Sequence, residues 1–337
     1  MSAPTEHELA AASTSVRRLL DQLNNVLYGQ EELVEMVVTG MLAGGHLLLE
    51  GLPGLGKTEL VKGLARALDM PAKRIQFTPD LLPGDITGNP VLQESGGRRE
   101  FVFQPGPIFA SLVLADEINR ASPKTQSALL EAMQERHVTV LGQTHPLPDP
   151  FHVLATQNPI ELEGTYPLPE AQLDRFLFKL EVSRGGSGTL ERIVLHRELG
   201  QTPDVPQVMD AAEWRGLMAM ARRLYLPPVV ANYIARVVDA THPGASKASA
   251  GVRFGASPRA ALSLAAASKA RAMLHGRPNA SFEDVRFLAP AVLRHRLILD
   301  YQARVEGKST GSVIEALLEE IPFDGEPLPR TLHNATP

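Results

Sequence analysis

The first half of the chain alternates between strand-like and helix-like patterns of hydrophobic residues. The strand-like runs are Leu47–Glu50, Lys73–Thr78, Ser111–Asp116, Phe151–Thr156 and Phe176–Val182. Continuous apolarity, which is clearest in the third run, is typical of a strand that is buried on both faces of a parallel sheet. Most segments between the runs carry apolar residues at helical spacing. The pattern therefore predicts an α/β fold with a five-stranded parallel sheet and interleaved helices.

Two segments interrupt this alternation. Asn89–Gln93 and Arg99–Phe103 are short β-like runs around a Ser-Gly-Gly turn, and they predict a hairpin inserted within residues 83–106. A second hairpin is predicted over residues 137–147, with its turn at Gly142. The alternative for the first segment is a solvated loop, although an inserted hairpin is a common way to add a functional part to a scaffold.

Helical periodicity dominates the second half of the chain. It follows Ser183–Gly188, a Gly/Ser-rich break that is a candidate hinge. The expected helices are Gly188–Leu199, Ala211–Leu224, Pro227–Thr241, Ser257–His275, Ser281–Leu288 and Val292–Leu299. No strand-like alternation is evident there. We therefore expect a core over residues 1–183, a linker helix over 184–200 and a small helical domain over 201–330.

The composition narrows the class of protein. The 337 residues are 44% hydrophobic, which leaves enough apolar side chains for a sizeable core. A net charge of −5 argues against a dedicated nucleic-acid binder. The absence of cysteine excludes disulfides and thiolate metal sites. The sequence shows neither a secretory signal nor an apolar run of membrane-spanning length, so we expect a soluble cytoplasmic protein.

The clearest chemical motif lies between the first strand and the following helix. It consists of Gly51, Leu52, Pro53, Gly54, Leu55, Gly56, Lys57 and Thr58, and Glu59 continues into the helix. A strand, a glycine-rich turn, Lys-Thr and a helix make up a P-loop, whose backbone N–H groups surround phosphate oxygens. Lys57 would reach the β- and γ-phosphates of ATP, and the Thr58 hydroxyl would ligate Mg²⁺.

Acidic and amide side chains follow two further strands. Asp116 ends the third run, where it could hold Mg²⁺, and Glu117 could act as the base that orients the attacking water. Asn158 follows the fourth run, and its amide could bind the γ-phosphate or the water. In isolation each could be an ordinary strand-end residue. The turn at Val26–Gly29 could contact a nucleotide base or be a plain helix–helix corner, and the sequence leaves this open.

Two arginines have positions that suit phosphate binding. Arg175 precedes the last strand, and Arg259 begins a helix of the second half. A guanidinium forms planar, charge-assisted hydrogen bonds with phosphate, although surface ion pairs are the commoner role of such residues.

The order of these motifs resembles that of the AAA+ ATPases, with Walker A, Walker B, a first sensor, an arginine finger and a second sensor in turn. Within that superfamily the sequence is most similar to the MoxR family. The stretches that carry the resemblance are FQPGPIF from Phe103, LADEINRASPKTQSALLEAMQE from Leu114, ATQNP from Ala155, PEAQLDRF from Pro169, GASPRA from Gly255 and LRHR from Leu293.

The resemblance implies an αβα core followed by an all-helical lid domain. It also implies a homo-oligomeric ring, commonly a hexamer, with ATP between the subunits. Arg175 would then act on the γ-phosphate of a neighbouring subunit, and Arg259 would sense the nucleotide from the lid. Arg120 is a rival for the arginine that acts in trans. Both hairpins would face the centre of the ring.

MoxR-like ATPases are thought to be chaperone-like, to remodel partner proteins or assist metal-cofactor insertion, and often to work with proteins that carry a von Willebrand factor A domain. The leading prediction is therefore an ATP-driven remodelling enzyme. A nucleic-acid-stimulated AAA+ motor is the alternative, against which the net charge and the lack of a basic or zinc module argue. A nucleotide-gated binding module without turnover is a third hypothesis, and Lys57, Asp116 and Glu117 argue against it.

Overall fold

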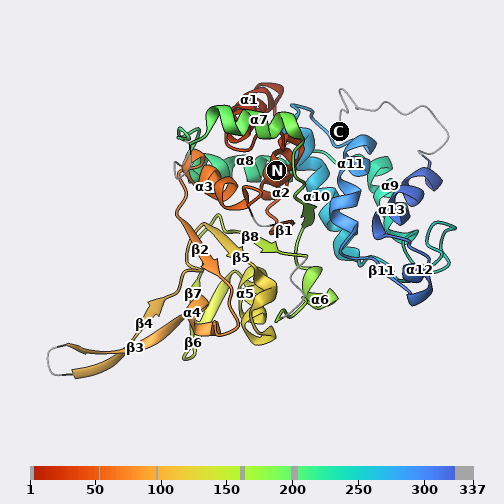
Figure 1. Cartoon of the computed structure of the whole chain (residues 1–337). Coiled ribbons are helices and arrows are strands. Elements are labelled where there is room, and N and C mark those ends of the chain that lie inside the picture. Colours follow the sequence, from red (N-terminus) through yellow and green to blue (C-terminus); the bar gives the residue numbers. More distant parts are fainter. Residues whose placement is uncertain (1–3, 53, 96–97, 160–163, 199–203, 323–337) are drawn as a thin grey trace.

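A five-stranded parallel sheet forms the centre of the protein. The computed structural model describes residues 4–52, 54–95, 98–159, 164–198 and 204–322 (Figure 1). The strands are β1 (Leu47–Glu50), β2 (Ala72–Gln76), β5 (Leu112–Asp116), β8 (His152–Gln157) and β9 (Phe178–Glu181), in the order β2-β5-β8-β1-β9. All neighbours in the sheet run parallel, so the predicted sheet is confirmed. Because β8 lies between β5 and β1, the carboxyl ends of these three strands adjoin.

Helices cover both faces of the sheet. One face carries α1 (Glu6–Asn24), α2 (Glu31–Leu42), α3 (Lys57–Ala67) and α8 (Ala211–Arg223), and the other carries α5 (Pro123–Glu135). Alternate side chains of β1 serve the two layers, since Leu47 and Leu49 belong to the first hydrophobic cluster and Leu48 belongs to the second, with Leu129 of α5. The strands β1, β5 and β8 are thus buried on both faces, as their continuous apolarity indicates, whereas the first three residues of the edge strand β2 are exposed.

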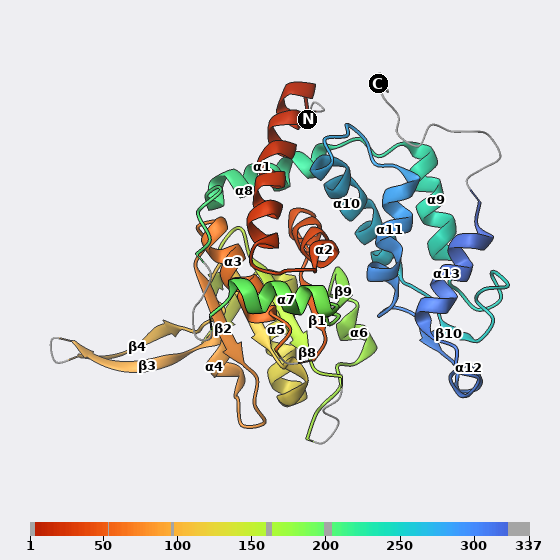
Figure 2. The same ribbon diagram turned by 45° about the horizontal axis from the view of Figure 1, so that its top comes forward.

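Both predicted hairpins are present. β3 (Gly88–Ser95) pairs antiparallel with β4 (Arg98–Pro105), and β6 (His137–Val140) pairs with β7 (Gln143–Pro146). The turn at Gly96–Gly97 lies outside the described residues. A short helix, α4 (Pro83–Thr87), leads into β3. The β3–β4 hairpin projects well beyond the body of the protein in both views (Figures 1 and 2).

The root of the projecting hairpin is made of glycines in close backbone contact. Gly88 has a φ of +99°, and a Cβ there would lie 2.4 Å from the Gln104 carbonyl oxygen. A Cβ at Gly106 would lie 2.2 Å from the Ile86 carbonyl oxygen. Only glycine fits both positions, so the strands leave the body with their backbones packed directly together.

Helices dominate the second half of the chain, as predicted. They are α7 (Ser187–His196), α8, α9 (Pro228–Asp239), α10 (Pro258–Leu274), α11 (Phe282–Leu293), α12 (Tyr301–Val305) and α13 (Thr310–Glu320). The helix expected over Val292–Leu299 is wrong. α11 continues through Pro290 to Leu293, and Ile298–Leu299 forms β11, which pairs with β10 (Val252–Phe254). Alternation over two or three residues is too short to be recognised in the sequence.

The segment after α7 returns to the core before the remaining helices form. The backbone N–H of Val208 donates to the carbonyl oxygen of Ala67 at the end of α3, over 2.8 Å. Trp214 of α8, the only tryptophan of the chain, is fully buried, and its indole N–H donates to Nε2 of His152 over 3.2 Å. This contact fixes α8 against the first residue of β8.

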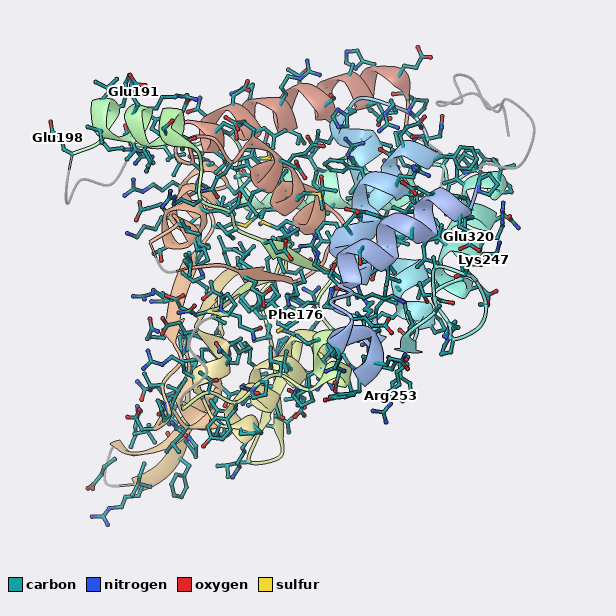
Figure 3. All side chains as sticks on the ribbon, turned by 45° about the vertical axis from the view of Figure 1, so that its right-hand side comes forward. Phe176, Glu191, Glu198, Lys247, Arg253 and Glu320 are labelled. Atoms are coloured by element: carbon teal, nitrogen blue, oxygen red, sulfur yellow. The ribbon has the colours of Figure 1, made fainter. Side chains whose placement is uncertain are left out.

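The last helix, α13, is bound to the loop between α9 and β10. Glu320 of α13 accepts hydrogen bonds from the backbone N–H groups of Lys247 and Ala248, at 3.0 and 2.8 Å (Figure 3). In the part of the chain that the structure describes, no helix has both the length and the apolar character that a bilayer crossing requires.

Candidate active site

The glycine-rich segment forms a tight turn at the amino terminus of α3. Gly54 and Gly56 have φ angles of +80° and +84°, a conformation that favours glycine. A Cβ at Gly56 would also lie 2.7 Å from the side chain of Leu27. α3 begins at Lys57, so its first N–H groups lack helical partners and are available to an anion. Lys57 Nζ donates to the Gly51 carbonyl oxygen over 2.6 Å.

Asp116 and Glu117 stand at the carboxyl end of β5, next to the end of β8. Thr156 of β8 links them: its hydroxyl donates to Asp116 Oδ1 over 2.6 Å and accepts from the Glu117 backbone N–H over 2.8 Å. Both acids therefore have fixed positions relative to the sheet. The contacts of Thr156 with the two acids could not be recognised from the sequence, because they depend on the pairing of β5 with β8.

Glu117 has an unusual backbone and two side-chain partners. Its φ of 57° and ψ of 51° lie in the left-handed region, which is costly for a residue with a Cβ and is often found at functional sites. Its Oε2 accepts from Gln76 Nε2 over 2.8 Å and from Arg120 Nη1 over 2.9 Å. Arg120 ends the short 3₁₀ helix η1 (Ile118–Arg120). These contacts hold the carboxylate in one position.

Arg74 of β2 contacts the other acid. Its Nε and Nη2 both donate to Asp116 Oδ2, over 3.1 and 2.7 Å, and Nη2 also donates to the Gln76 side-chain oxygen. The register pairs Gln76 with Asp116 and Arg74 with Leu114, so Arg74, Gln76 and Asp116 lie on the same face of the sheet. Arg74 and Gln76 are two residues apart and so lie on one face of a strand, but their contact with Asp116 depends on the pairing of β2 with β5.

These groups line a cavity of about 370 Å³. Its lining residues are Gly54, Gly56, Lys57, Thr58, Glu59, Arg74, Asp116, Glu117, Thr156 and Asn158. The structure thus brings together most of the residues expected from the P-loop, the acidic pair and Asn158. Gly51, Leu52 and Leu55 belong to the same turn without lining the cavity, and Pro53 lies outside the described residues.

The cavity has the chemistry of a site for a polyphosphate and a hard cation. Burial lowers the pKa of Lys57, while the nearby charges of Asp116, Glu117 and Glu50 oppose that shift. The Thr58 hydroxyl and the Asp116 carboxylate offer the oxygen donors that Mg²⁺ prefers, and Mg²⁺ usually binds through one or two carboxylates together with phosphate oxygens. Among the described residues there is no group of three or more His, Cys, Asp or Glu side chains that could hold a metal ion.

Arg175 and Arg259 lie elsewhere, and neither belongs to the lining of this cavity. Arg175 follows α6 (Glu170–Leu173) and is partly buried. Arg259 Nη1 lies 3.5 Å from Oδ2 of Asp174, the residue before Arg175. The expected role of Arg259 as a nucleotide sensor stays a prediction. The docking of α10 beside α6 places this residue with Arg175.

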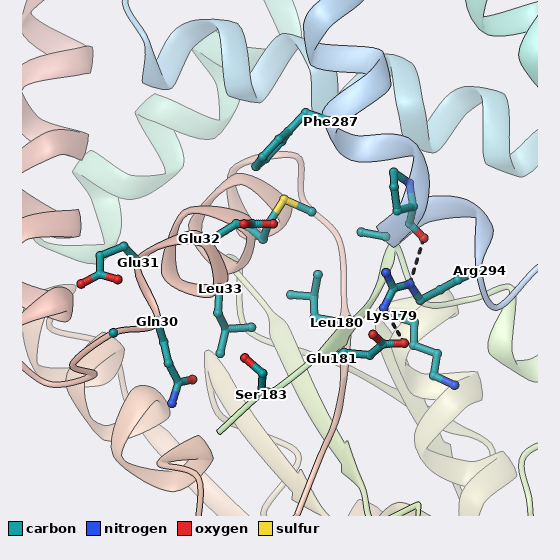
Figure 4. Close-up of a pocket in the computed structure, with 14 residues that line it drawn as sticks. Gln30, Glu31, Glu32, Leu33, Lys179, Leu180, Glu181, Ser183, Phe287 and Arg294 are labelled. Atoms are coloured by element: carbon teal, nitrogen blue, oxygen red, sulfur yellow. Dashed lines mark hydrogen bonds and ion pairs between the residues drawn. The ribbon is translucent and has the colours of Figure 1, made fainter. Parts of the chain in front are cut away.

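A second cavity, of about 550 Å³, is linked to the P-loop through Gln30 (Figure 4). It lies between the start of α2, the end of β9 and α11, where Glu181 pairs with Arg294 over 2.7 Å. Gln30 lines this cavity and donates from Nε2 to the Leu55 carbonyl oxygen over 3.2 Å. The turn at Val26–Gly29 is thus a helix–helix corner with Val26 and Leu27 buried, and its Gly29 also borders a space of nucleoside size.

Two known families match parts of the chain. The family described as "ATPase family associated with various cellular activities (AAA)" matches residues 46–178, which include the P-loop, the acidic pair and Arg175. The family described as "AAA lid domain" matches residues 244–317.

Similar proteins extend over most of the chain. Chaperone MoxR1 of Mycobacterium tuberculosis is 44% identical over 317 residues, which are 93% of this chain and 83% of that protein. Protein MoxR of Methylorubrum extorquens is 30% identical over 327 residues, 89% and 93% of the two chains. A crystal structure from Cytophaga hutchinsonii, described as that of an ATPase, superposes with a TM-score of 0.87 at 38% identity and covers 94% of this chain and 97% of its own. The chain belongs to the MoxR family of AAA+ ATPases.

Proposed function

We propose that this ATPase couples ATP hydrolysis to the remodelling of partner proteins, and that the 370 Å³ cavity is its hydrolytic site. The observation that carries the proposal is the convergence of Lys57, Asp116, Glu117 and Asn158 on this one cavity. Lys57 and the first turn of α3 bind the phosphates. Glu117 accepts a proton from the attacking water, and Asn158 orients that water or the γ-phosphate.

Mg²⁺ at Thr58 and Asp116 would neutralise charge on the phosphate oxygens when bound. The chain's own groups prepare that position, because Thr156 fixes the Asp116 carboxylate and the strained backbone of Glu117 directs the second acid separately. The nucleoside would occupy the 550 Å³ cavity. Glu31 and Glu32, which line this cavity, could accept hydrogen bonds from the ribose hydroxyls.

A ring of subunits, commonly six in this family, would complete the site. Arg175 and Arg259, which are brought together by the contact of Arg259 with Asp174, lie away from the cavity of their own chain, where they could serve a neighbour. α7 exposes Leu190, Val194 and Leu195 by 47%, 78% and 70%, and adjacent apolar side chains of this size are typical of a protein contact surface.

The partner protein would be engaged by the projecting hairpin. Leu92 and Phe101 face each other across β3 and β4 and are 52% and 67% exposed. Hydrolysis would shift the helical domain against the core and so move the hairpins. A protein with a von Willebrand factor A domain is the partner class that family membership suggests, and maturation of a metalloprotein is one outcome of such remodelling.

The decisive experiment compares Glu117→Gln with the wild-type protein. The variant should bind ATP with unchanged affinity and lose hydrolysis by a factor of at least 10², the range for removal of a general base. Glu319→Gln, at an exposed position on α13, is the matched control and should hydrolyse ATP normally. Normal turnover in Glu117→Gln would refute the assignment. A pull-down with the ATP-bound variant would then identify the partner.

A further inference from the structure

The bonding of Asp116 limits how this carboxylate can receive a metal ion. Its Oδ1 accepts from Thr156, and its Oδ2 accepts two N–H groups, both from Arg74. A carboxylate oxygen has two lone-pair sites, so Arg74 occupies both sites of Oδ2. Asp116 is also well shielded, with a side chain that is only 15% exposed. A cation can therefore use Oδ2 only if Arg74 moves.

Arg74 is able to move. Its side chain is 53% exposed, and β2 is an edge strand of the sheet, so no neighbouring strand confines the guanidinium on that side. An ion pair that is half exposed is weak, and the cost of breaking it is small. Arg74 also lines the 370 Å³ cavity, so the released guanidinium would find phosphate oxygens close by.

The same guanidinium is connected to the second acid. Arg74 Nη2 donates to the side-chain oxygen of Gln76, and Gln76 Nε2 donates to Glu117 Oε2 over 2.8 Å. Gln76 is thus oriented by Arg74 at one end and holds Glu117 at the other. The contacts of Arg74 with Asp116 and with Gln76 are separate, and both would be lost if the guanidinium turned toward the phosphates.

We propose that Arg74 is a positioning residue that competes with Mg²⁺ for Oδ2 of Asp116. The inference rests on the proposed placing of Mg²⁺ at Asp116. Before the metal arrives, Arg74 neutralises Asp116. Once the metal takes Oδ2, Arg74 moves toward the phosphates.

The test measures metal binding without turnover. Mn²⁺, whose free ion gives an electron paramagnetic resonance signal, is titrated into the full-length protein in the absence of nucleotide. Arg74→Gln should bind Mn²⁺ about fivefold more tightly than wild type, the size expected for loss of a half-exposed competing ion pair. Affinity for a fluorescent ATP analogue in EDTA is measured on the wild-type protein only, because Arg74 lines the cavity and its loss would also change phosphate binding.

Lys73→Gln is the matched control, since it removes a positive charge from the adjacent residue of β2, whose side chain points to the opposite face of the strand. It should leave Mn²⁺ affinity within about twofold of wild type. Arg74→Lys keeps the charge but offers one nitrogen, and it should give a smaller gain than Arg74→Gln.

Equal Mn²⁺ affinity in wild type and Arg74→Gln would overturn the inference, as would an equal gain in Lys73→Gln. If Arg74→Gln fails to fold, Arg74→Lys decides in its place, and no gain there would also refute the competition. Failure of the proposed function would be distinct: the wild-type protein would then not bind the ATP analogue in EDTA at all.

Discussion

Phe103 of β4 stacks on His145 of β7, with ring centroids 3.9 Å apart and ring planes inclined by 20°. Phe103 also meets Phe109 edge to face, at 5.6 Å. The two inserted hairpins, which are separate two-stranded sheets, are thereby joined through one aromatic residue.

Phe103→Ala should uncouple the hairpins. Aromatic pairs of this kind contribute about 1 kcal/mol beyond the apolar area that they bury, so the β6–β7 hairpin should open more often. Hydrogen–deuterium exchange should be faster in residues 137–146, while ATP binding stays normal. Phe101→Ala is the control, because Phe101 is 67% exposed and lies two residues away on the same strand. Unchanged exchange in Phe103→Ala would show that the stacking does not join the hairpins.

A mixing experiment tests whether Arg175 or Arg120 is the proposed arginine that acts in trans. Arg120 contacts Glu117 of its own chain over 2.9 Å, whereas Arg175 is absent from the lining of its own cavity. The Arg175→Ala protein by itself should therefore not hydrolyse ATP. It should regain part of the activity when it is mixed with Lys57→Ala subunits, which supply an intact Arg175. Arg120→Ala should gain nothing from the same mixing. Steady-state phosphate release measures both, and rescue of Arg120→Ala instead would reverse the assignment.

Leu33→Trp tests the place of the nucleoside. Leu33 lines the 550 Å³ cavity, and a larger side chain would reduce the space without touching the P-loop. Affinity for ATP should fall about tenfold, while inorganic triphosphate, which lacks the nucleoside, should bind as it does to wild type. Competition against a fluorescent nucleotide measures both. An equal loss for the two ligands would mean that the substitution disturbs the P-loop itself.

Asp174→Asn should destabilise the junction between the core and the helical domain. Arg296 is 2% exposed and donates from Nε to Asp174 Oδ1 over 2.7 Å, so loss of the carboxylate leaves a buried guanidinium without its counter-charge. The free energy of unfolding should fall by about 2 kcal/mol. Arg259→Ala, which removes a more exposed partner of Asp174 at 3.5 Å, should cost far less. Urea unfolding compares the two variants.

Stability should decrease as the pH falls from 6.5 toward 4. Burial lowers the pKa of His152 to about 4, and it also lowers the pKa values of His46 and His295. The unfolded chain therefore binds more protons than the folded chain in this range, and protonation favours unfolding. Urea midpoints followed by Trp214 fluorescence should be lower at pH 5 than at pH 7. His152→Gln should weaken this dependence, and an unchanged dependence would show that His152 does not contribute.

Much of the site could be predicted from the sequence because its parts follow strands. Lys57 follows the glycine-rich turn after one apolar run, Asp116 ends another run and Asn158 comes directly after a third. Parallel strands bring their carboxyl ends to one edge. Arg74 and Gln76 could not be recognised, since their partners lie about 40 residues away and depend on the pairing of β2 with β5.

The contact of Arg259 with Asp174 could not be predicted from the sequence for a different reason. Its place depends on how α10 docks against the core, and that is decided by tertiary packing. Arg296 and Asp174 take part in that docking through a buried ion pair between residues 122 positions apart. Local patterns fix the helices of the second half but carry no information on this long-range contact.

The close backbone contacts at Gly88 and Gly106 make the root of the projecting hairpin stiff, so a rotation of the root moves the whole arm. Backbones packed this closely leave no side chain at the root to absorb a small rotation. β3 has eight residues, so the arm is roughly 26 Å long at about 3.3 Å per residue. A tilt of about 5° at the root would then sweep the far end of the arm through about 2 Å, a gain set by strand length alone. Lengthening or shortening β3 and β4 by two-residue steps would therefore change the distance that the far end of the arm moves for a given tilt at the root.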